Sequence, residues 1–141
     1  MKKNASASWS GGLKNGTGTV STATGVLRDA PYGFRSRFED GPGTNPEELL
    51  GAAHAGCYTM ALAAGLEQAG FSAAHIDTKA VVTLDKDGDG FAITTVDLTT
   101  RAKVPNIDKS TFDTIARATK EGCPVSKVLK ATITLDAQLE A

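Results

Sequence analysis

The sequence predicts one α+β domain over residues 1–141, with mainly antiparallel strands around a long buried central helix. Segments of alternating apolar and polar residues are joined by short turns rich in Gly, Asn and Asp, which is typical of antiparallel hairpins. Residues 49–66 carry no charged residue over 18 positions, as expected for a core helix. The sequence has neither the βαβ rhythm nor the glycine-rich motifs of nucleotide-binding sheets.

The chain is expected to begin with a hairpin over residues 5–22. Asn15-Gly16 lies between its two arms, and this dipeptide favours a tight primed turn. A further short strand is expected at Gly25–Leu27. Together these segments predict a small sheet ahead of the central helix.

The next strand, Tyr32–Phe38, is expected to carry two arginines on one face. Alternation along a strand places Phe34 and Phe38 on one side, and Arg35 and Arg37 together on the other. Two guanidinium groups on a common face would give this part of the chain a local source of positive charge.

The central helix has well-defined ends. Asn45 is a favourable N-cap, Pro46 suits the first helical position, and the two glutamates that follow complement the helix dipole. The helix is expected to reach Ala69 and to stop at Gly70. Its length and apolarity come near those of a membrane span, but no Lys or Arg anchors its flanks. We therefore interpret it as the core helix of a soluble protein.

The second half of the chain is expected to contain three strands and a second main helix. Alternation, capping and helical spacing predict these elements in the order strand, strand, helix, short helix and strand. Their expected ranges are Ile76–Leu84, Phe91–Arg101, Thr111–Glu121, Pro124–Leu129 and Ala131–Leu139. The complete expected order is therefore βββ-α-ββ-α-β.

Composition favours a cytoplasmic protein that associates with a second copy. The apolar residues are heavily alanine and only one Trp, two Tyr and five Phe are present, so apolar surface is expected to remain for burial between subunits. The net charge of −1 includes no basic run that could contact a row of phosphates, which argues against nucleic-acid binding. No apolar segment follows the charged N-terminus, so no signal peptide is expected.

Two cysteines are the main candidates for chemistry. In a reducing compartment, such residues are more often catalytic, redox-active or metal-bound than joined in a structural disulfide. Cys57 lies within the uncharged helix, and Cys123 lies in the segment Gly-Cys-Pro-Val-Ser, where the helical pattern breaks. If the fold brings the two sulfurs together, one can act as nucleophile and the other can resolve it as a disulfide. Otherwise they are two ordinary buried thiols.

The two thiols differ in what they need to react. Burial raises the pKa of Cys57 and leaves it unreactive unless a cation lies nearby. Arg35 and Arg37 are the candidate cations, and a glutamate of the first helical turn could hold a guanidinium in place. Cys123 lies between a helix-ending glycine and a helix-starting proline, so it is a candidate N-cap whose thiolate is stabilised.

A metal site is an alternative use of the same residues. His54 lies one turn before Cys57 on the same helical face, and the pair could chelate an ion together with Cys123 and His75. The close Cys-x-x-Cys pair of structural zinc sites and of thioredoxin-like sites is absent. We therefore interpret His54 as a packed or hydrogen-bonded residue.

Several segments spread over nearly the whole chain carry a distinctive pattern. The most specific are Thr-Asn-Pro-Glu-Glu before the central helix, the cysteine within that helix, and Gly-Cys-Pro-Val-Ser. With the other segments they cover residues 18–22, 31–34, 37–39, 43–49, 51–57, 91–94, 122–126 and 129–131. In these segments the sequence resembles the OsmC/Ohr peroxidase family, and its osmotically inducible OsmC branch in particular.

This resemblance implies a thiol-dependent peroxidase that reduces organic hydroperoxides, and hydrogen peroxide less efficiently, to alcohols. It implies that Cys57 is the peroxidatic residue, which forms a sulfenic acid, and that Cys123 resolves it as an intramolecular disulfide. It further implies that Arg37 and Glu47 form the ion pair that activates the thiolate, with Arg35 as the local competitor of Arg37.

The resemblance also implies an OsmC-like fold and an intertwined homodimer with its active sites at the subunit interface. No metal, flavin or haem is required, because an external dithiol reduces the disulfide, and in the Ohr branch that dithiol belongs to a lipoylated protein. Two alternative functions remain. One is a metal-binding or redox-sensing dimer that uses Cys57, His54 and Cys123 without turnover, and the other is a non-enzymatic dimer that binds a small molecule.

Overall fold

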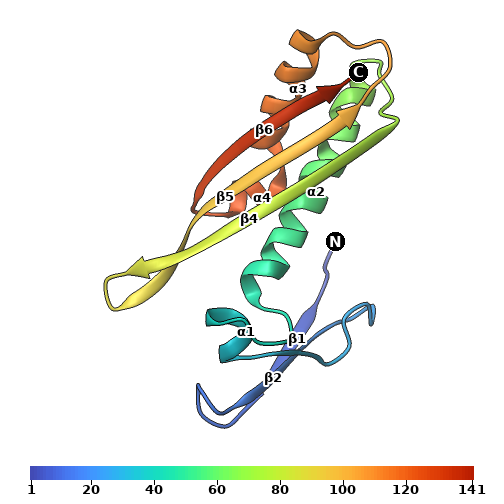
Figure 1. Cartoon of the computed structure of the whole chain (residues 1–141). Coiled ribbons are helices and arrows are strands. Elements are labelled where there is room, and N and C mark those ends of the chain that lie inside the picture. Colours follow the sequence, from blue (N-terminus) through green and yellow to red (C-terminus); the bar gives the residue numbers. More distant parts are fainter. The chain divides into compact units, whose positions relative to one another are not determined.

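The computed structural model describes residues 1–141 and divides into two compact units, Met1–Leu49 and Leu50–Ala141. The elements follow the predicted order of three strands, helix, two strands, helix and strand (Figure 1). The short helix expected after the second main helix is present, and a further short helix precedes the central helix. Each unit contains one three-stranded sheet. The predicted α+β class is confirmed.

The sheet of the first unit is antiparallel throughout. Its strands pair in sequence order and are β1 (Ala5–Ser10), β2 (Thr17–Thr22) and β3 (Ala30–Tyr32). The predicted hairpin is present, but residues 11–16 form its loop, so Asn15-Gly16 does not make a two-residue turn. Gly11 has a φ of 95° and its carbonyl accepts a hydrogen bond from Trp9 Nε1 at 3.1 Å, which shapes this longer loop.

Two predicted strand segments proved wrong. Gly25–Leu27 is a bend, in which Gly25 has a φ of 80°. Phe34–Phe38 forms the short helix α1 instead of extending a strand. A spacing of four residues between two phenylalanines fits a helical turn as well as strand alternation, and their ring centroids lie 5.1 Å apart. Because the segment is helical, Arg35 and Arg37 do not share a strand face.

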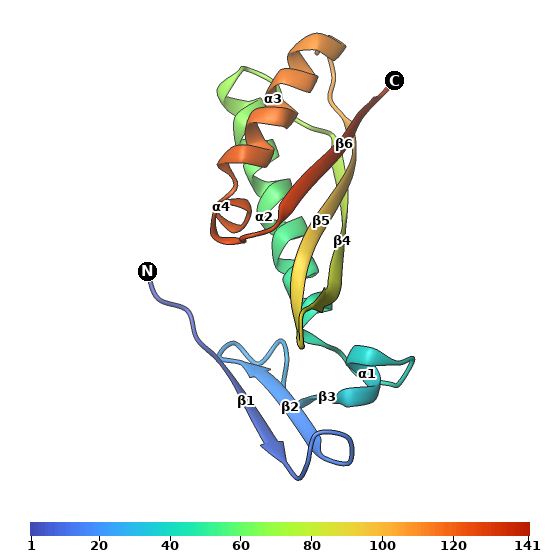
Figure 2. The ribbon, with the colours of Figure 1, turned by 90° about the vertical axis from the view of Figure 1, so that its left-hand side faces the viewer.

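The second unit packs helices on one face of a mixed sheet (Figure 2). Strand β5 pairs antiparallel with β4 and parallel with β6, so antiparallel pairing predominates in the chain as predicted. Strands β5 and β6 are parallel because α3 and α4 form a crossover between them. The elements are α2 (Pro46–Gln68), β4 (His75–Asp87), β5 (Gly90–Lys103), α3 (Lys109–Gly122), α4 (Pro124–Val128) and β6 (Thr132–Glu140).

Helix α2 is buried on one face within this unit. Tyr58, Leu62 and Leu66 are fully buried in the core that β5 and α3 complete. Met60 lies on another face and is 77% exposed. By length and composition α2 could cross a membrane. Of its apolar window, 28% is buried inside this chain.

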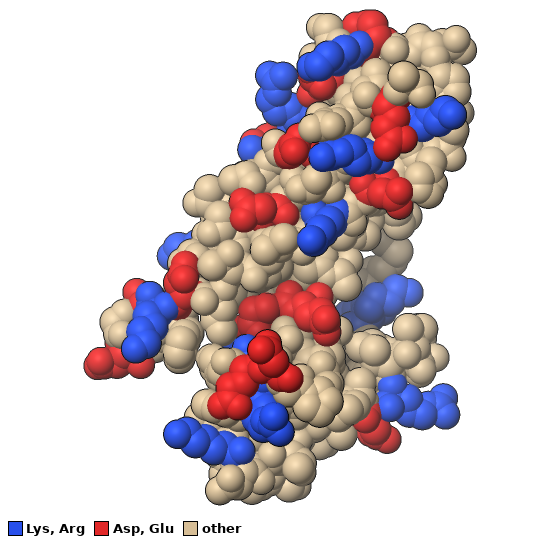
Figure 3. All heavy atoms as spheres, in the orientation of Figure 1, with Lys and Arg blue, Asp and Glu red and all other residues tan.

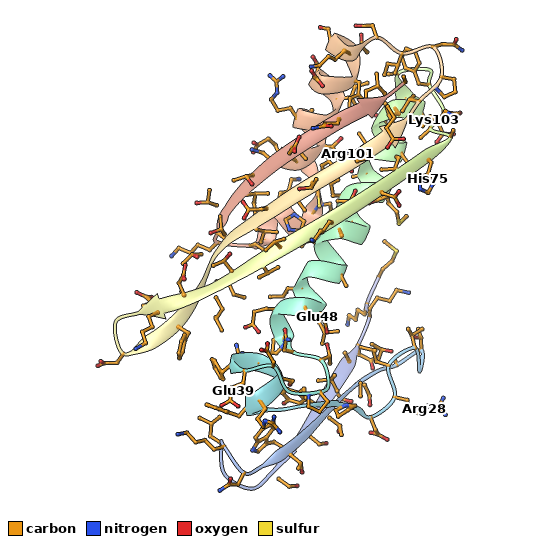
Figure 4. The ribbon with its side chains drawn as sticks, viewed as in Figure 1. Arg28, Glu39, Glu48, His75, Arg101 and Lys103 are labelled. Atoms are coloured by element: carbon orange, nitrogen blue, oxygen red, sulfur yellow. The ribbon has the colours of Figure 1, made fainter.

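The opposite face of the sheet is polar. Figure 3 shows basic and acidic side chains interspersed over β4, β5 and β6 with no extended area of one sign. Arg101 of β5 lies 3.8 Å from Asp136 of β6, and Arg101 is labelled in Figure 4. The buried polar and thiol groups of this unit therefore lie on the helix-covered side.

The predicted N-cap of α2 gives a first test of the fold. Asn45 Oδ1 accepts a hydrogen bond from the backbone N–H of Glu48 at 2.7 Å, and Asn45 Nδ2 donates to the Ser36 carbonyl at 2.9 Å. Asn45→Ala removes both bonds and is expected to lower the free energy of unfolding by about 1 to 2 kcal/mol, measured by denaturant titration. Asn45→Asp keeps the capping acceptor and should recover part of the loss. An Asn45→Ala protein as stable as the parent would contradict this role.

Candidate active site

The two cysteines lie in contact although 66 positions separate them in the sequence. Cys57 on α2 and Cys123 between α3 and α4 have their Sγ atoms 2.9 Å apart, in a thiol–thiol hydrogen bond. Both are free thiols. A small movement therefore separates this pair from a disulfide bond.

Local backbone geometry fixes the position of Cys123. Its N–H donates to the Thr119 carbonyl at 2.9 Å and ends α3, while its own carbonyl accepts from the Lys127 N–H at 3.1 Å in α4. Pro124 supplies the first residue of α4, where the missing N–H costs nothing. The helix break that singled out this residue in the sequence thus points its side chain at α2.

Only one of the two sulfurs is open to a solute. Cys57 is partly exposed, whereas Cys123 is fully buried, with a relative exposure of 0%. A small molecule in solution can therefore reach Cys57 before it reaches Cys123. Cys123 can react only with a partner that Cys57 already holds.

Hydrogen bonds distribute negative charge unequally within the pair. Burial raises the pKa of Cys57, and its hydrogen bond with Cys123 raises that pKa further. Burial also acts to raise the pKa of Cys123, but hydrogen bonds from Cys57 and from the backbone and hydroxyl of Ser126 outweigh it and lower that pKa. The pKa of Tyr58 is raised by burial and, in addition, by the charge on Cys123. Within this unit, the thiolate is therefore favoured on Cys123, and a reactive Cys57 needs a cation.

The first unit contains a well-formed ion pair between Arg37 and Glu47. Arg37 Nη2 lies 2.8 Å from Glu47 Oε1, and Nε lies 3.1 and 3.3 Å from the two carboxylate oxygens. The Glu47 side chain is only 10% exposed. Arg35 instead meets Glu39 at 3.6 Å in solvent, with its side chain 70% exposed. Of the two arginines considered in the sequence, Arg37 is the one held by a buried carboxylate.

An apolar pocket of about 330 Å³ borders the same arginine. Trp9 and Tyr32 meet edge to face there, with ring centroids 5.6 Å apart. The lining residues are Trp9, Leu13, Tyr32, Gly33, Phe34, Arg37 and Phe38. The first unit thus places one guanidinium at the edge of a predominantly apolar surface.

The two histidines lie in different surroundings. His54 is fully buried on α2, and its Nε2 lies 2.7 Å from Ser126 Oγ. His75 starts β4 opposite Lys103, near the end of the strand pair labelled in Figure 4, and its Nε2 lies 2.8 Å from Asp77. The four residues considered as metal ligands do not converge, since no group of three such side chains forms in the structure.

Sequence reasoning missed Ser126 as part of this cluster. It follows Cys123 by three positions in α4, and its backbone and side chain both act to lower the pKa of the Cys123 thiol. The sequence signal that could have identified Ser126 was its position three residues after a candidate helix-capping cysteine. No sequence signal pointed to its contact with His54, which lies 72 positions away.

Comparison with known proteins places the chain among redox-active relatives. Residues 39–138 match the family model described as OsmC-like protein. Peroxiredoxin OsmC of Escherichia coli (strain K12) is 58% identical over 141 residues, covering 100% of this chain and 99% of that protein. Peroxiredoxin OsmC of Shigella flexneri has the same identity and coverage.

Solved structures share the fold. The organic hydroperoxide resistance protein OhrB of Bacillus subtilis matches with a TM-score of 0.70 and 25% identity, over 96% of this chain and 98% of that one. An OsmC-like protein of unknown function from Vibrio cholerae matches with a TM-score of 0.78 and 14% identity, over 98% and 99% of the two chains. The second likeness is one of fold alone. The fold implied by the sequence resemblance is confirmed.

Proposed function

Because the chain belongs to the OsmC-like protein family, we propose that it is a thiol peroxidase that reduces organic hydroperoxides to alcohols through Cys57 and Cys123. The observation that supports this best is the 2.9 Å contact between an accessible sulfur and a buried one. Such a pair can take up an oxidising equivalent at the outer thiol and store it as a disulfide.

The first step is attack of the Cys57 thiolate on one peroxide oxygen. The O–O bond breaks, the alcohol leaves after its oxygen takes up a proton, and Cys57 becomes a sulfenic acid. Arg37 has two tasks in this step: it favours the thiolate form of Cys57 and stabilises negative charge on the departing oxygen. Glu47 holds the guanidinium through its bidentate pairing.

The second step joins the two cysteines as a disulfide, and a third step regenerates the two thiols. Cys123 condenses with the sulfenic acid to give an intramolecular disulfide and water. An external dithiol, of the lipoyl type, then reduces the disulfide by exchange. No prosthetic group takes part. The apolar pocket at Arg37 suits the organic part of the substrate, which makes organic hydroperoxides better substrates than hydrogen peroxide.

The active form is proposed to be a cytoplasmic, intertwined homodimer with active sites at its interface, each subunit being a single OsmC-like domain of residues 1–141. An apolar face of α2 that this chain leaves exposed supports association. Its exposed members are Ala52, Ala53, Gly56, Met60, Ala63 and Ala64. Apolar surface of this kind is normally covered by a partner.

Turnover separates the peroxidase from a redox sensor. With cumene hydroperoxide in excess and dihydrolipoamide as reductant, the protein should consume many equivalents of peroxide per chain. A sensor without turnover would consume one equivalent and stop. Binding of zinc by the reduced protein, with no loss of thiols on peroxide addition, would instead support the metal-binding alternative.

Replacing the buried cysteine tests its separate role. Cys123→Ser should leave the first step intact, so one equivalent of hydroperoxide should convert Cys57 to a sulfenic acid that persists because no second thiol condenses with it. Dimedone should then label Cys57 in a single turnover, as read by mass spectrometry of peptides. A Cys123→Ser protein that gives no adduct while still consuming peroxide would remove Cys123 from the resolving step.

A further inference from the structure

Arg37 lies on a helix that is too short to hold its own position. Helix α1 contains five residues, and isolated helices shorter than about 12 residues are only marginally stable in water. The Arg37 side chain is 37% exposed, and an ion pair with so exposed a partner is weak unless the backbone presents both groups in place. The pairing of Arg37 with Glu47 therefore depends on contacts that fix α1 against the start of α2.

Ser36, the residue before Arg37, makes two of these contacts through its buried hydroxyl. Its Oγ accepts a hydrogen bond from the Gly33 N–H at 2.9 Å and donates to the Thr44 carbonyl at 2.7 Å. A hydroxyl has one proton, so the shorter bond to Thr44 takes it in preference to the Gly33 carbonyl, which lies 3.1 Å away. One side chain thus links the first turn of α1 to the segment that precedes α2.

Asn45 provides a second link between the same two segments. Its Nδ2 donates to the Ser36 carbonyl at 2.9 Å, while its Oδ1 caps α2 by accepting from the Glu48 N–H at 2.7 Å. Glu47 lies in the helical turn that this cap begins, two residues after Asn45. The amide therefore connects the residue before Arg37 to the turn that carries its carboxylate partner.

The loop between the two helices fixes Thr44 beside β3. The Thr44 N–H donates to the Pro31 carbonyl at 2.9 Å, and Tyr32 forms an isolated parallel bridge with Thr44. Gly43 has a φ of 105°, and a Cβ at this position would lie 2.5 Å from the Pro31 carbonyl oxygen. Any other residue would be strained there. The loop thus gives the Ser36 hydroxyl a fixed carbonyl to bind.

The neighbouring glutamates are held by other groups. Glu48 Oε2 accepts a hydrogen bond from Thr44 Oγ1 at 2.7 Å, and Glu39 Oε1 lies 3.6 Å from Arg35 Nε. Glu47 is thus the carboxylate that receives the Arg37 guanidinium. The two links described above are hydrogen bonds between uncharged groups, so they persist whatever the charge on these side chains.

We propose that Ser36 and Asn45 are positioning residues, which fasten α1 to the first turn of α2 and so hold the Arg37 guanidinium in place for peroxide reduction. This inference rests on the proposed function, in which Arg37 favours the Cys57 thiolate and stabilises charge on the departing oxygen. A guanidinium that is already held in place loses less side-chain entropy when the transition state forms. Both residues therefore act through Arg37.

Stopped-flow measurement of cumene hydroperoxide loss across pH tests this link. Ser36→Ala should slow sulfenic acid formation by about 3- to 10-fold, the range expected for losing a hydrogen bond, and should move the midpoint of the pH–rate profile upward. In the Arg37→Ala protein the same substitution should have no further effect, because the group that it positions is gone. A purely structural role would leave the midpoint unchanged and would slow both backgrounds equally.

Asn45→Ser separates positioning from capping, and it keeps the test available if Ser36→Ala does not fold. Serine retains a capping oxygen for the Glu48 N–H but lacks the amide that reaches the Ser36 carbonyl. The free energy of unfolding should stay near the parent value while the rate falls by about 3- to 10-fold. Ser21→Ala is the matched control, because Ser21 Oγ also accepts a backbone N–H in the first unit, from Asp29 at 2.9 Å. It should change neither rate nor midpoint.

Hydrogen exchange at the Arg37 side chain tests the positioning without any peroxide. The Nε–H of Arg37 is bonded to the Glu47 carboxylate, so its NMR signal, identified by its loss in Arg37→Lys, should exchange slowly with solvent. Exchange should be about 3- to 10-fold faster in Ser36→Ala and Asn45→Ser, and unchanged in Ser21→Ala. If the parent protein reduces no hydroperoxide but these changes appear, the proposed function fails and the positioning stands. Unchanged exchange, or equal slowing by Ser36→Ala with and without Arg37, would overturn the inference.

Discussion

Cys57→Ser is expected to lower the rate of organic hydroperoxide reduction by more than about a thousandfold, because removal of a reacting nucleophile has effects of at least this size. A serine hydroxyl is not ionised at neutral pH, whereas the thiolate is the attacking form of cysteine. The assay is loss of cumene hydroperoxide in the presence of a dithiol. No disulfide and no dimedone adduct should form in the same protein.

Comparison with Cys123→Ser is the control for Cys57→Ser, because each variant retains one of the two thiols. Ser126, which acts to lower the pKa of Cys123, remains in place in Cys57→Ser. Cys123 is also fully buried, so it should not react with peroxide. If Cys57→Ser kept its activity and Cys123→Ser lost it, the two roles would have to be exchanged.

Arg37→Ala is expected to slow sulfenic acid formation by about 100- to 1,000-fold, as for removal of one group that stabilises charge in a transition state. Burial and the contact with Cys123 raise the pKa of Cys57, so the second unit does not itself provide a reactive Cys57 thiolate. A cation lowers the pKa of a neighbouring thiol, and its loss moves the midpoint of the pH–rate profile upward. Stopped-flow measurement of peroxide loss across pH gives both the rate and the midpoint.

Other arginines of the first unit provide matched comparisons. Arg28 lies in the segment between β2 and β3, and Figure 4 shows its side chain at the edge of the unit, so Arg28→Ala should leave the rate unchanged. Arg35→Ala removes the local competitor, which pairs with Glu39 in solvent. A larger effect of Arg35→Ala than of Arg37→Ala would assign the activating role to Arg35. Arg37→Lys should recover little, because an ammonium cannot reproduce the bidentate pairing with Glu47.

Local signals predicted the elements that positioned the thiols. Asn45, Pro46 and Gly70 marked the ends of α2 to within two residues, since capping depends on neighbours in the sequence. The break at Cys123 was also local, and it does separate α3 from α4. The segment Phe34–Phe38 was predicted wrongly because five residues are too few to distinguish a period of two from one of 3.6.

Long-range contacts could not be predicted from the residues alone. The meeting of Cys57 with Cys123 depends on the crossover between β5 and β6, which no pattern in either segment specifies. The prediction that Arg37 pairs with Glu47 came from the family resemblance. The residues alone did not specify it, because the segment that forms α1 was expected to be a strand. The bond between His54 and Ser126 links α2 to α4 through the same crossover.

Oxidation by a hydroperoxide is expected to join the two cysteines of one chain, because their sulfurs already lie 2.9 Å apart. The direct test is to add one equivalent of cumene hydroperoxide to the reduced protein, block free thiols, and analyse intact protein and peptides by mass spectrometry. The expected products are one equivalent of alcohol, a chain lighter by two hydrogen atoms, and a peptide pair linked through Cys57 and Cys123. An oxidised Cys57 beside a free Cys123, or a disulfide that joins two chains, would contradict it.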